Sequence, residues 1–158
     1  MAKQFVYMFD EIKKGNTEEM QFLLGNKGAQ LSEMTSIGLP VPPGFQIAAE
    51  ACRDFYSLGK KWPSGLEAQV KEKLSKLEKK LGKSFGDLKN PLFVSVRSGS
   101  YVSMPGMMDT VLNLGMNDET VVSFAKKTKN ERGAFDSYRR FIQMFGNVVM
   151  NVEHAKFE

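Results

Sequence analysis

The sequence predicts a domain of the mixed α and β class (α+β), and three of its features lead to this expectation. Short aromatic and β-branched runs alternate with longer amphipathic stretches along the 158 residues. Glycine and proline are scattered between these runs as turn residues rather than gathered in blocks. The composition is that of an ordinary globular protein, 42% hydrophobic and 25% charged. We therefore expect one domain, or one lobe of a larger domain, over residues 1–158.

The first part of the chain contains two predicted strands and three predicted helices. Gly25-Asn26-Lys27-Gly28 is expected to form a tight turn between the first two helices. Gly38 is a natural left-handed residue at which the second of them would end. The expected segments, in order, are a strand at 4–9, a helix at 17–25, a helix ending before Gly38, a strand at 45–48 and a helix at 49–58.

The next segment, residues 64–82, has the clearest helical pattern of the chain. Ser64 and Glu67 have the spacing of a capping box, and Gly82 is a stop signal. Between them runs one apolar stripe, which we interpret as core packing: Leu66, Val70, Leu74, Leu77 and Leu81. Six lysines interleaved with glutamates occupy the same region and indicate a solvated helix face: Lys71, Lys73, Lys76, Lys79, Lys80 and Lys83.

The remaining segments are again strands followed by helices. Residues 92–96 form a nearly continuous apolar run, which predicts a strand buried on both faces. Residues 110–114 resume as a strand, and Asn117 or Asp118 can cap a helix through Phe124. A last helix is expected over residues 131–150, with a broad apolar face.

Charge and cysteine content exclude several function classes. The net charge of +4 is mild and no aromatic residues interleave with the lysines, so nucleic-acid binding is not expected. The sequence contains neither a membrane-length apolar run nor a secretory signal, which favours a cytoplasmic protein without membrane contact. The single cysteine, Cys52, offers neither a disulfide nor a metal cluster and is interpreted as a small residue buried in a helix.

Three segments could carry chemistry, and each also has a plain structural interpretation. Around Lys27, glycines before a helix could turn backbone N–H groups toward an anion, or could form a simple turn with a surface lysine. Arg97 directly follows an apolar strand and must either find an acceptor or reach solvent. That acceptor could be a phosphate or a structural carboxylate. The methionine-rich segment 103–110 could cover a ligand as a lid, or dock on a neighbouring lobe.

Taken in order, these segments resemble the start of the pyruvate, phosphate dikinase family. The shared words are L-L-G-x-K-G-x-x-L-x-E-M, G-L-P-V-P-P-G-F, S-V-R-S-G, S-M-P-G-M-M-D-T-V-L-N-L-G and D-S-Y-R-R-F-I-Q-M-F-G. They cover essentially the whole chain. Phosphoenolpyruvate synthases share the first half of the pattern, but S-M-P-G-M-M-D-T and Y-R-R-F-I-Q-M favour the dikinases.

This resemblance implies a fold and an activity. The family's N-terminal region is an ATP-grasp nucleotide-binding domain, of which this chain would be the first lobe. The full-length enzyme is a phosphotransferase that interconverts ATP, phosphate and pyruvate with AMP, diphosphate and phosphoenolpyruvate. It works through a phosphohistidine on a separate domain, which lies outside this chain. The implied cofactors are ATP and Mg²⁺, and the implied partners are inorganic phosphate, the remaining lobe, the phosphohistidine domain and a second copy in a homodimer.

The resemblance also implies roles for individual residues. Lys27 and Arg97 occupy the positions of the family's phosphate-contacting cations and would be its catalytic residues here. The magnesium ligands would lie outside this chain, so no metal ligand is expected within it. The residues expected to contact the ATP phosphates are Lys27, Arg97, Ser103, Met104, Gly106, Asp109 and Thr110.

The chain departs from the family pattern in two places. Asn26 stands where the family has a second glycine, although asparagine tolerates left-handed backbone better than most residues. Ser100-Tyr101-Val102 also differs from the small-residue run expected there.

Three interpretations of the chain remain open. It could be a part of a full dikinase that is inactive by itself, or a stand-alone protein that binds nucleotide, phosphate or a dikinase. It could also be an oligomerisation module that associates through bare apolar surface.

Overall fold

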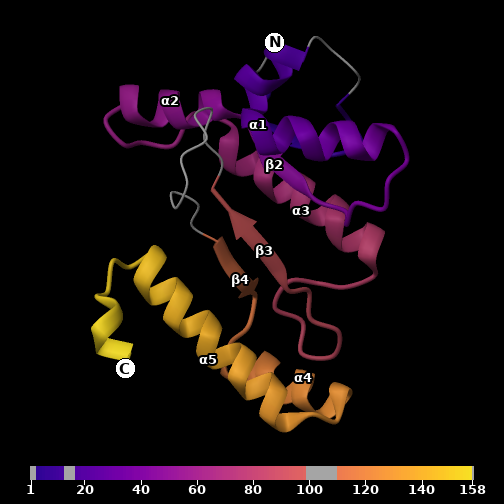
Figure 1. Ribbon diagram of the computed structural model, residues 1–158, viewed down its shortest axis with the longest axis vertical. Helices are drawn as coiled ribbons and strands as arrows, with labels where there is room; N and C mark the ends of the chain where they lie inside the picture. Colours follow the sequence, from indigo (N-terminus) through magenta and orange to yellow (C-terminus); the bar gives the residue numbers. More distant parts are fainter. Residues whose placement is uncertain (1–2, 13–16, 99–109, 158) are drawn as a thin grey trace. The chain divides into compact units, whose positions relative to one another are not determined.

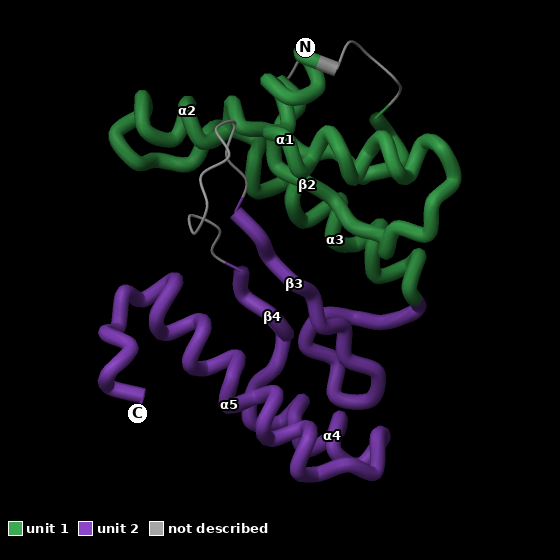
Figure 2. The backbone as a smooth tube through the Cα atoms, in the orientation of Figure 1, with its two compact units in different colours: residues 1–81, 99–107 green, residues 82–98, 108–158 purple. Residues whose placement is uncertain are grey.

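The computed structural model describes residues 3–12, 17–98 and 110–157, and it confirms the α+β class (Figure 1). The described residues divide into two compact units, one ending at Leu81 and the other beginning at Gly82 (Figure 2). Unit 1 contains β1 (Val6–Met8), α1 (Thr17–Ser36), β2 (Phe45–Ile47), α2 (Ala49–Ser57) and α3 (Leu66–Leu81). Unit 2 contains β3 (Val94–Arg97), β4 (Thr110–Leu114), α4 (Asp118–Thr128), α5 (Glu131–Val148) and the 3₁₀ helix η1 (His154–Phe157).

Unit 1 is built on an antiparallel strand pair covered by α3. β1 and β2 pair with Val6 opposite Ile47. Its core gathers these buried or half-buried side chains: Phe5, Val6, Ala51, Leu66, Phe45 and Val70. Gln69 of α3 accepts hydrogen bonds from the N–H groups of Phe5 (2.7 Å) and Val6 (3.2 Å). One helix side chain thereby satisfies backbone donors at the start of β1.

The glycine turn expected after residue 24 is present as a kink inside α1. Gly25 has φ 73° and ψ 164°, which are not helical values, so α1 consists of two helical segments that meet there. Gly38 has φ 82°, the left-handed geometry expected beyond the helix end. Both glycine signals in the sequence were therefore interpreted correctly.

Two expectations about α3 are wrong. The Ser64–Glu67 capping box does not form, because the helix begins at Leu66 and the Gln69 N–H bonds to the carbonyl of Gly65. Lys73 is not solvated: it is 7% exposed, and its ammonium lies 2.6 Å from the carboxylate of Glu11. Lys73 lies within the apolar stripe, three residues after Val70 and four before Leu77, so the helix turns it to the same buried face as Leu77.

Unit 2 pairs β3 with β4 in antiparallel fashion and packs α5 against β4 and α4. Its core cluster consists of buried or half-buried side chains of α4 and α5: Val121, Ala125, Ala134, Phe124 and Tyr138. Asn117 caps α4 with a capping box, accepting hydrogen bonds from the N–H groups of Glu119 and Thr120. The expected helix start at Asn117 is thus confirmed.

The expectation that residues 92–96 form a strand buried on both faces is wrong. Leu92 is buried, but Val96 is 48% exposed. The reason lies in the sheet, since β3 has β4 as its single strand neighbour in the described part of the chain. A strand in a two-stranded sheet is seldom covered on both sides.

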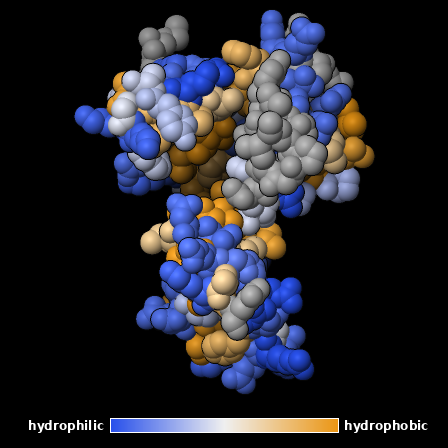
Figure 3. Space-filling view, turned by 60° about the vertical axis from the view of Figure 1, so that its left-hand side comes forward, coloured by the Kyte–Doolittle hydropathy of each residue, from blue (hydrophilic) through white to orange (hydrophobic). Residues whose placement is uncertain are grey.

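The apolar face of α5 is also incompletely covered. Phe135 is 43% exposed, Ile142 46% and Val149 49%. Hydrophobic surface lies among hydrophilic surface on the face shown in Figure 3. None of the helices in residues 3–12, 17–98 and 110–157 has the length and hydropathy needed to cross a membrane.

Candidate functional site

Lys27 lies in the first turn of the helical segment that begins after the Gly25 kink. The first N–H groups of a helix have no acceptor within the helix, so they are free to bind an anion or a capping group. Lys27 is half-buried, and no ion pair joins it to a carboxylate within the described ranges. The segment therefore presents a cation at a helix N-terminus, a geometry that suits a phosphate group.

Packing against β2 fixes the position of this turn. Gly28 is buried, and a side-chain carbon added to it would overlap the side-chain oxygen of Gln46 and lie 2.9 Å from the Leu24 Cβ. Gln46 lies across Gly28 and donates a hydrogen bond of 3.0 Å to the hydroxyl of Ser32, which is 1% exposed. The absence of a side chain at Gly28 lets β2 approach the turn that carries Lys27.

Arg97 and Thr110 lie opposite each other at the paired ends of β3 and β4 (Figure 1). Directly opposed residues of an antiparallel pair point their side chains to the same face. Arg97 is exposed and Thr110 half-buried. Among residues 3–12, 17–98 and 110–157, no carboxylate forms an ion pair with Arg97. The structure thus brings together a guanidinium and a hydroxyl, which can both donate hydrogen bonds to one anion.

The remaining predicted contact residues are not in the described part of the chain. Outside the described residues lie Ser103, Met104, Gly106 and Asp109. The two interpretations of the methionine-rich segment, as a lid or as a docking surface, concern this same part of the chain. Lys27 belongs to unit 1, whereas Arg97 and Thr110 belong to unit 2.

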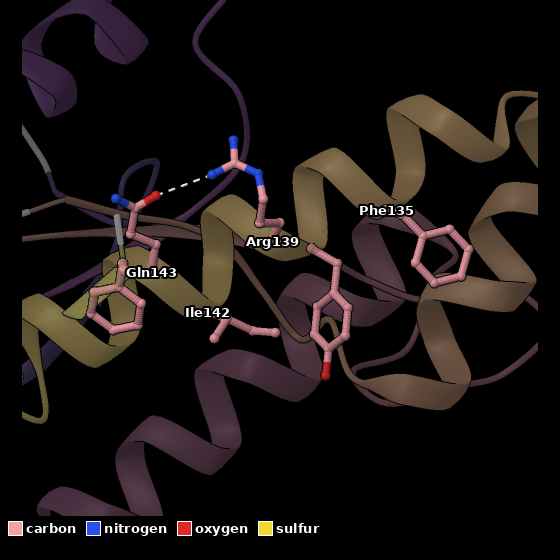
Figure 4. A pocket seen from close by; sticks show the side chains of 6 residues that line it. Phe135, Arg139, Ile142 and Gln143 are labelled. Atoms are coloured by element: carbon pink, nitrogen blue, oxygen red, sulfur yellow. Dashed lines mark hydrogen bonds between the residues drawn. The ribbon is translucent and has the colours of Figure 1, made fainter. Parts of the chain in front are cut away.

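The helix α5 carries a pocket that was not predicted from the sequence. It has a volume of about 300 Å³ and is lined mainly by apolar side chains of α5: Phe135, Tyr138, Arg139, Ile142, Gln143 and, from η1, Phe157. Figure 4 shows Arg139 and Gln143 joined by a hydrogen bond of 3.2 Å, with the Phe135 ring further along the helix. The apolar face predicted for the last helix was the one sign of this pocket in the sequence. That pattern did not predict that Phe157 of η1 would fold back to line the pocket.

The charged groups around this pocket are paired within α5. Asp136 accepts from Arg139 at 3.0 Å and from Arg140 at 2.8 Å. The hydrogen bond from Arg139 and then the nearby arginine charges hold the pKa of Asp136 below its usual value, although desolvation opposes the shift. The Nε2 atom of His154 lies 3.2 Å from the Nε2 atom of Gln143. Arg139, which lines the pocket, and Arg140 thus share the carboxylate of Asp136 on their own helix.

The cysteine and the possible metal ligands were also located in the structure. Cys52 is exposed on α2, so its interpretation as a buried residue is wrong; it lies on the outer side of the short helix, whereas Ala51 is in the core. Within the part of the chain that the structure describes, no three His, Cys, Asp or Glu side chains lie close enough to hold a metal ion.

The donors described above match the chemistry of a nucleotide's phosphate chain better than that of its metal. A half-buried lysine at a helix N-terminus and a guanidinium beside a hydroxyl are cations and N–H or O–H donors, as phosphate oxygens require. Mg²⁺ prefers carboxylate, carbonyl and water oxygens. The Lys27 turn of unit 1 and the Arg97–Thr110 pair of unit 2 are each, taken separately, suited to phosphate oxygens, and neither is assigned to a metal.

Comparison with known proteins shows which proteins the chain is similar to. A family model described as "Pyruvate phosphate dikinase, AMP/ATP-binding domain" matches residues 21–62, a stretch that includes Lys27 and Gly28. The chain is 52% identical over all its 158 residues to pyruvate, phosphate dikinase 1, chloroplastic, from Arabidopsis thaliana. It is 54% identical over 155 residues, 98% of its length, to the pyruvate, phosphate dikinase of Entamoeba histolytica, and 54% over 158 residues to that of Clostridium symbiosum.

These relatives are much longer than the chain. It spans 16% of the Arabidopsis protein, 17% of the Entamoeba protein and 18% of the Clostridium protein. The aligned stretches cover all or nearly all of the chain, so they span the segments that carry Lys27, Arg97 and Thr110. Over its whole length, the chain is therefore similar to one part of the pyruvate, phosphate dikinases.

Proposed function

We propose that the chain is the ATP-binding part of a pyruvate, phosphate dikinase and supplies the first lobe of its nucleotide-binding domain. The observation that supports this most strongly is the match of residues 21–62 to an AMP/ATP-binding domain, within a chain that is more than 50% identical to dikinases throughout. The full protein would interconvert ATP, phosphate and pyruvate with AMP, diphosphate and phosphoenolpyruvate. The phosphohistidine that carries the phosphoryl group would lie outside these 158 residues.

Lys27 and Arg97 act in this proposal by neutralising phosphate oxygens. Phosphoryl transfer depends mainly on positioning and on stabilising the charge that the transferred group spreads over its oxygens. Lys27 supplies a point charge beside helix N–H groups, while Arg97 supplies a planar fork that can bond two oxygens at once. Thr110 adds a hydroxyl next to Arg97. The same proposal gives Ser103, Met104, Gly106 and Asp109 contacts with the phosphates.

The proposal extends to the cofactor, partners and compartment of the whole protein. Mg²⁺, when bound, would screen the phosphate charges and polarise the phosphoryl group. Its ligands would come from the remaining lobe. The partners would be inorganic phosphate, that lobe, the phosphohistidine domain and a second copy of the enzyme, in the cytoplasm.

Calorimetric titration of the purified chain with magnesium-ATP tests the proposal directly. Arg97→Ala is expected to weaken binding about tenfold or more, which corresponds to about 1.4 kcal/mol. Arg97→Lys keeps the charge but not the planar guanidinium fork. Its affinity for magnesium-ATP should therefore lie between those of the unaltered chain and of Arg97→Ala. Arg132→Ala is the matched control, since Arg132 is an exposed arginine on α5 of the same unit.

Two results would count against these assignments. If Arg97→Ala bound magnesium-ATP as tightly as the unaltered chain, the role of Arg97 would be wrong. If the unaltered chain failed to bind at all, the lobe would not hold the nucleotide by itself.

A further inference from the structure

The β3–β4 pair changes register between its two ends. Val94 lies opposite Leu114, but Val96 lies opposite Val111 and Arg97 opposite Thr110. One residue of β3 therefore faces two residues of β4, Leu112 and Asn113. This is a β-bulge on β4.

Asn113 makes the bulge possible. Its φ is 59°, in the left-handed region that disfavours most side chains but that asparagine tolerates. It is half-buried, and its carbonyl accepts a hydrogen bond of 3.1 Å from the N–H of Met116, which holds the chain where β4 leaves the sheet.

The bulge decides which residue faces Arg97. A regular ladder continued from the Val94–Leu114 pair would place Arg97 opposite Val111 and turn Thr110 to the other face, because one residue of slip reverses every side chain. Val111 is only 5% exposed, so Arg97 would then share a face with a core residue. With the bulge, Val96 shares the face of Val111, and Arg97 shares that of Thr110.

We propose that Asn113 is a positioning residue: its left-handed backbone sets the register that places the Arg97 guanidinium and the Thr110 hydroxyl side by side as donors to one phosphate group. The inference rests on the proposed function, in which both residues contact the phosphates of ATP. In this inference Asn113 has no contact of its own with the phosphate. Its effect reaches the ligand only through the pairing of the two strands.

A matched pair of substitutions tests the role. Asn113→Gly keeps the left-handed backbone available, whereas Asn113→Val opposes it with a β-branched side chain. Interstrand nuclear Overhauser effects report the register, and titration with inorganic tripolyphosphate reports phosphate binding without the nucleoside. Asn113→Gly should keep the Arg97–Thr110 contacts and bind within about twofold of the unaltered chain. Asn113→Val should replace them by Arg97–Val111 contacts and bind at least about fivefold more weakly.

Thr110→Val is the second variant, for the case that Asn113→Val does not fold. Valine keeps the β-branched shape that suits a strand but removes the hydroxyl. The register should stay unchanged, and tripolyphosphate binding should weaken about threefold. Unchanged binding in Thr110→Val would overturn the paired-donor arrangement.

The remaining outcomes separate this inference from the proposed function. If Asn113→Val keeps the Arg97–Thr110 register, or loses it without loss of tripolyphosphate affinity, the positioning role of Asn113 is wrong while the proposed function stands. If the unaltered chain binds no tripolyphosphate, the chain does not hold phosphate by itself, and the ligand half of the inference is wrong, whatever the register of Asn113→Val.

Discussion

Lys73 is the residue whose environment differs most from what its neighbours in the sequence indicate. It stands among solvated lysines, yet it is 7% exposed and pairs with Glu11. Glu11 also lies 3.3 Å from Lys76, and it accepts from the N–H of Met8 at 3.1 Å. A buried ammonium needs such a partner, because an unpaired charge away from water is very costly. One carboxylate thus ties α3 to the chain just after β1.

The pKa of Glu11 makes this contact dependent on pH. Burial by itself raises the pKa of this carboxyl, but the hydrogen bond from Lys73, the N–H of Met8 and the Lys76 ammonium together lower it to about 2. Because the folded-state pKa lies below the ordinary value, the contribution to stability is complete above the unfolded-state pKa. It is lost as the pH falls toward about 2.

We expect Glu11→Gln to lower the free energy of unfolding by roughly 1–3 kcal/mol near neutral pH, and by less in acid. Urea unfolding of both proteins at about pH 7 and about pH 3 measures the difference. Glu67→Gln is the control, because Glu67 pairs with Lys71 on the exposed side of α3. This substitution should change the free energy of unfolding much less. Equal effects of Glu11→Gln at both pH values would contradict the expected linkage.

At the scale of elements, the approach of β2 to α1 depends on one missing side chain. Gly28 leaves room for Gln46 to reach Ser32, and this contact holds the turn that carries Lys27. An alanine there would favour the helix by propensity but would push Gln46 away. Overpacking should be the larger effect, since both neighbours of the new methyl group belong to a packed interface.

Gly28→Ala is accordingly expected to lower the free energy of unfolding by roughly 1–3 kcal/mol. Gln30→Ala, at an exposed position of the same helix, should be near neutral and separates helix propensity from crowding. Urea denaturation followed by circular dichroism provides the comparison. A Gly28→Ala chain at least as stable as the original would show that the interface can adapt.

Most elements could be predicted from the sequence because their signals are local. Gly25, Gly38 and Asn117 act through backbone geometry and capping within a few residues, and the structure agrees at each of them. The burial of Lys73, the exposure of Val96 and the bulge at Asn113 depend on contacts between segments far apart in the chain. Periodicity within one segment contains no information about such partners.

At the scale of the whole molecule, the sequence indicated a resemblance to one family but not a complete site. Long shared sequence motifs indicated a resemblance to the dikinases. The comparisons agree with this resemblance over the entire chain. The structure adds that Arg97 faces Thr110, which required a register that no motif encodes. The roles of Lys27, Arg97, Ser103, Met104, Gly106, Asp109 and Thr110 stay predictions until binding is measured.

The share of the relatives that the chain spans leads to an expectation about turnover. It covers only 16–18% of dikinases from Arabidopsis, Entamoeba and Clostridium. In the proposed scheme the phosphohistidine and the pyruvate site belong to other parts of the enzyme. The 158 residues alone should therefore form no phosphoenolpyruvate from pyruvate, ATP and phosphate in a coupled assay. Steady formation above the level of a protein-free control would refute this expectation.

Cys52 has a practical consequence, because it is exposed and is the single cysteine of the sequence. A maleimide dye attached to it would label every molecule once, at a known place on α2, without any mutation. The neighbouring Arg53 guanidinium lies over the Phe22 ring of α1, 4.6 Å from its centroid. A fluorophore at this thiol would therefore sit beside a contact between α2 and the helix that carries Lys27. The same thiol limits air oxidation to one covalent bond per chain, so oxidised material can form disulfide-linked pairs and no larger covalent species.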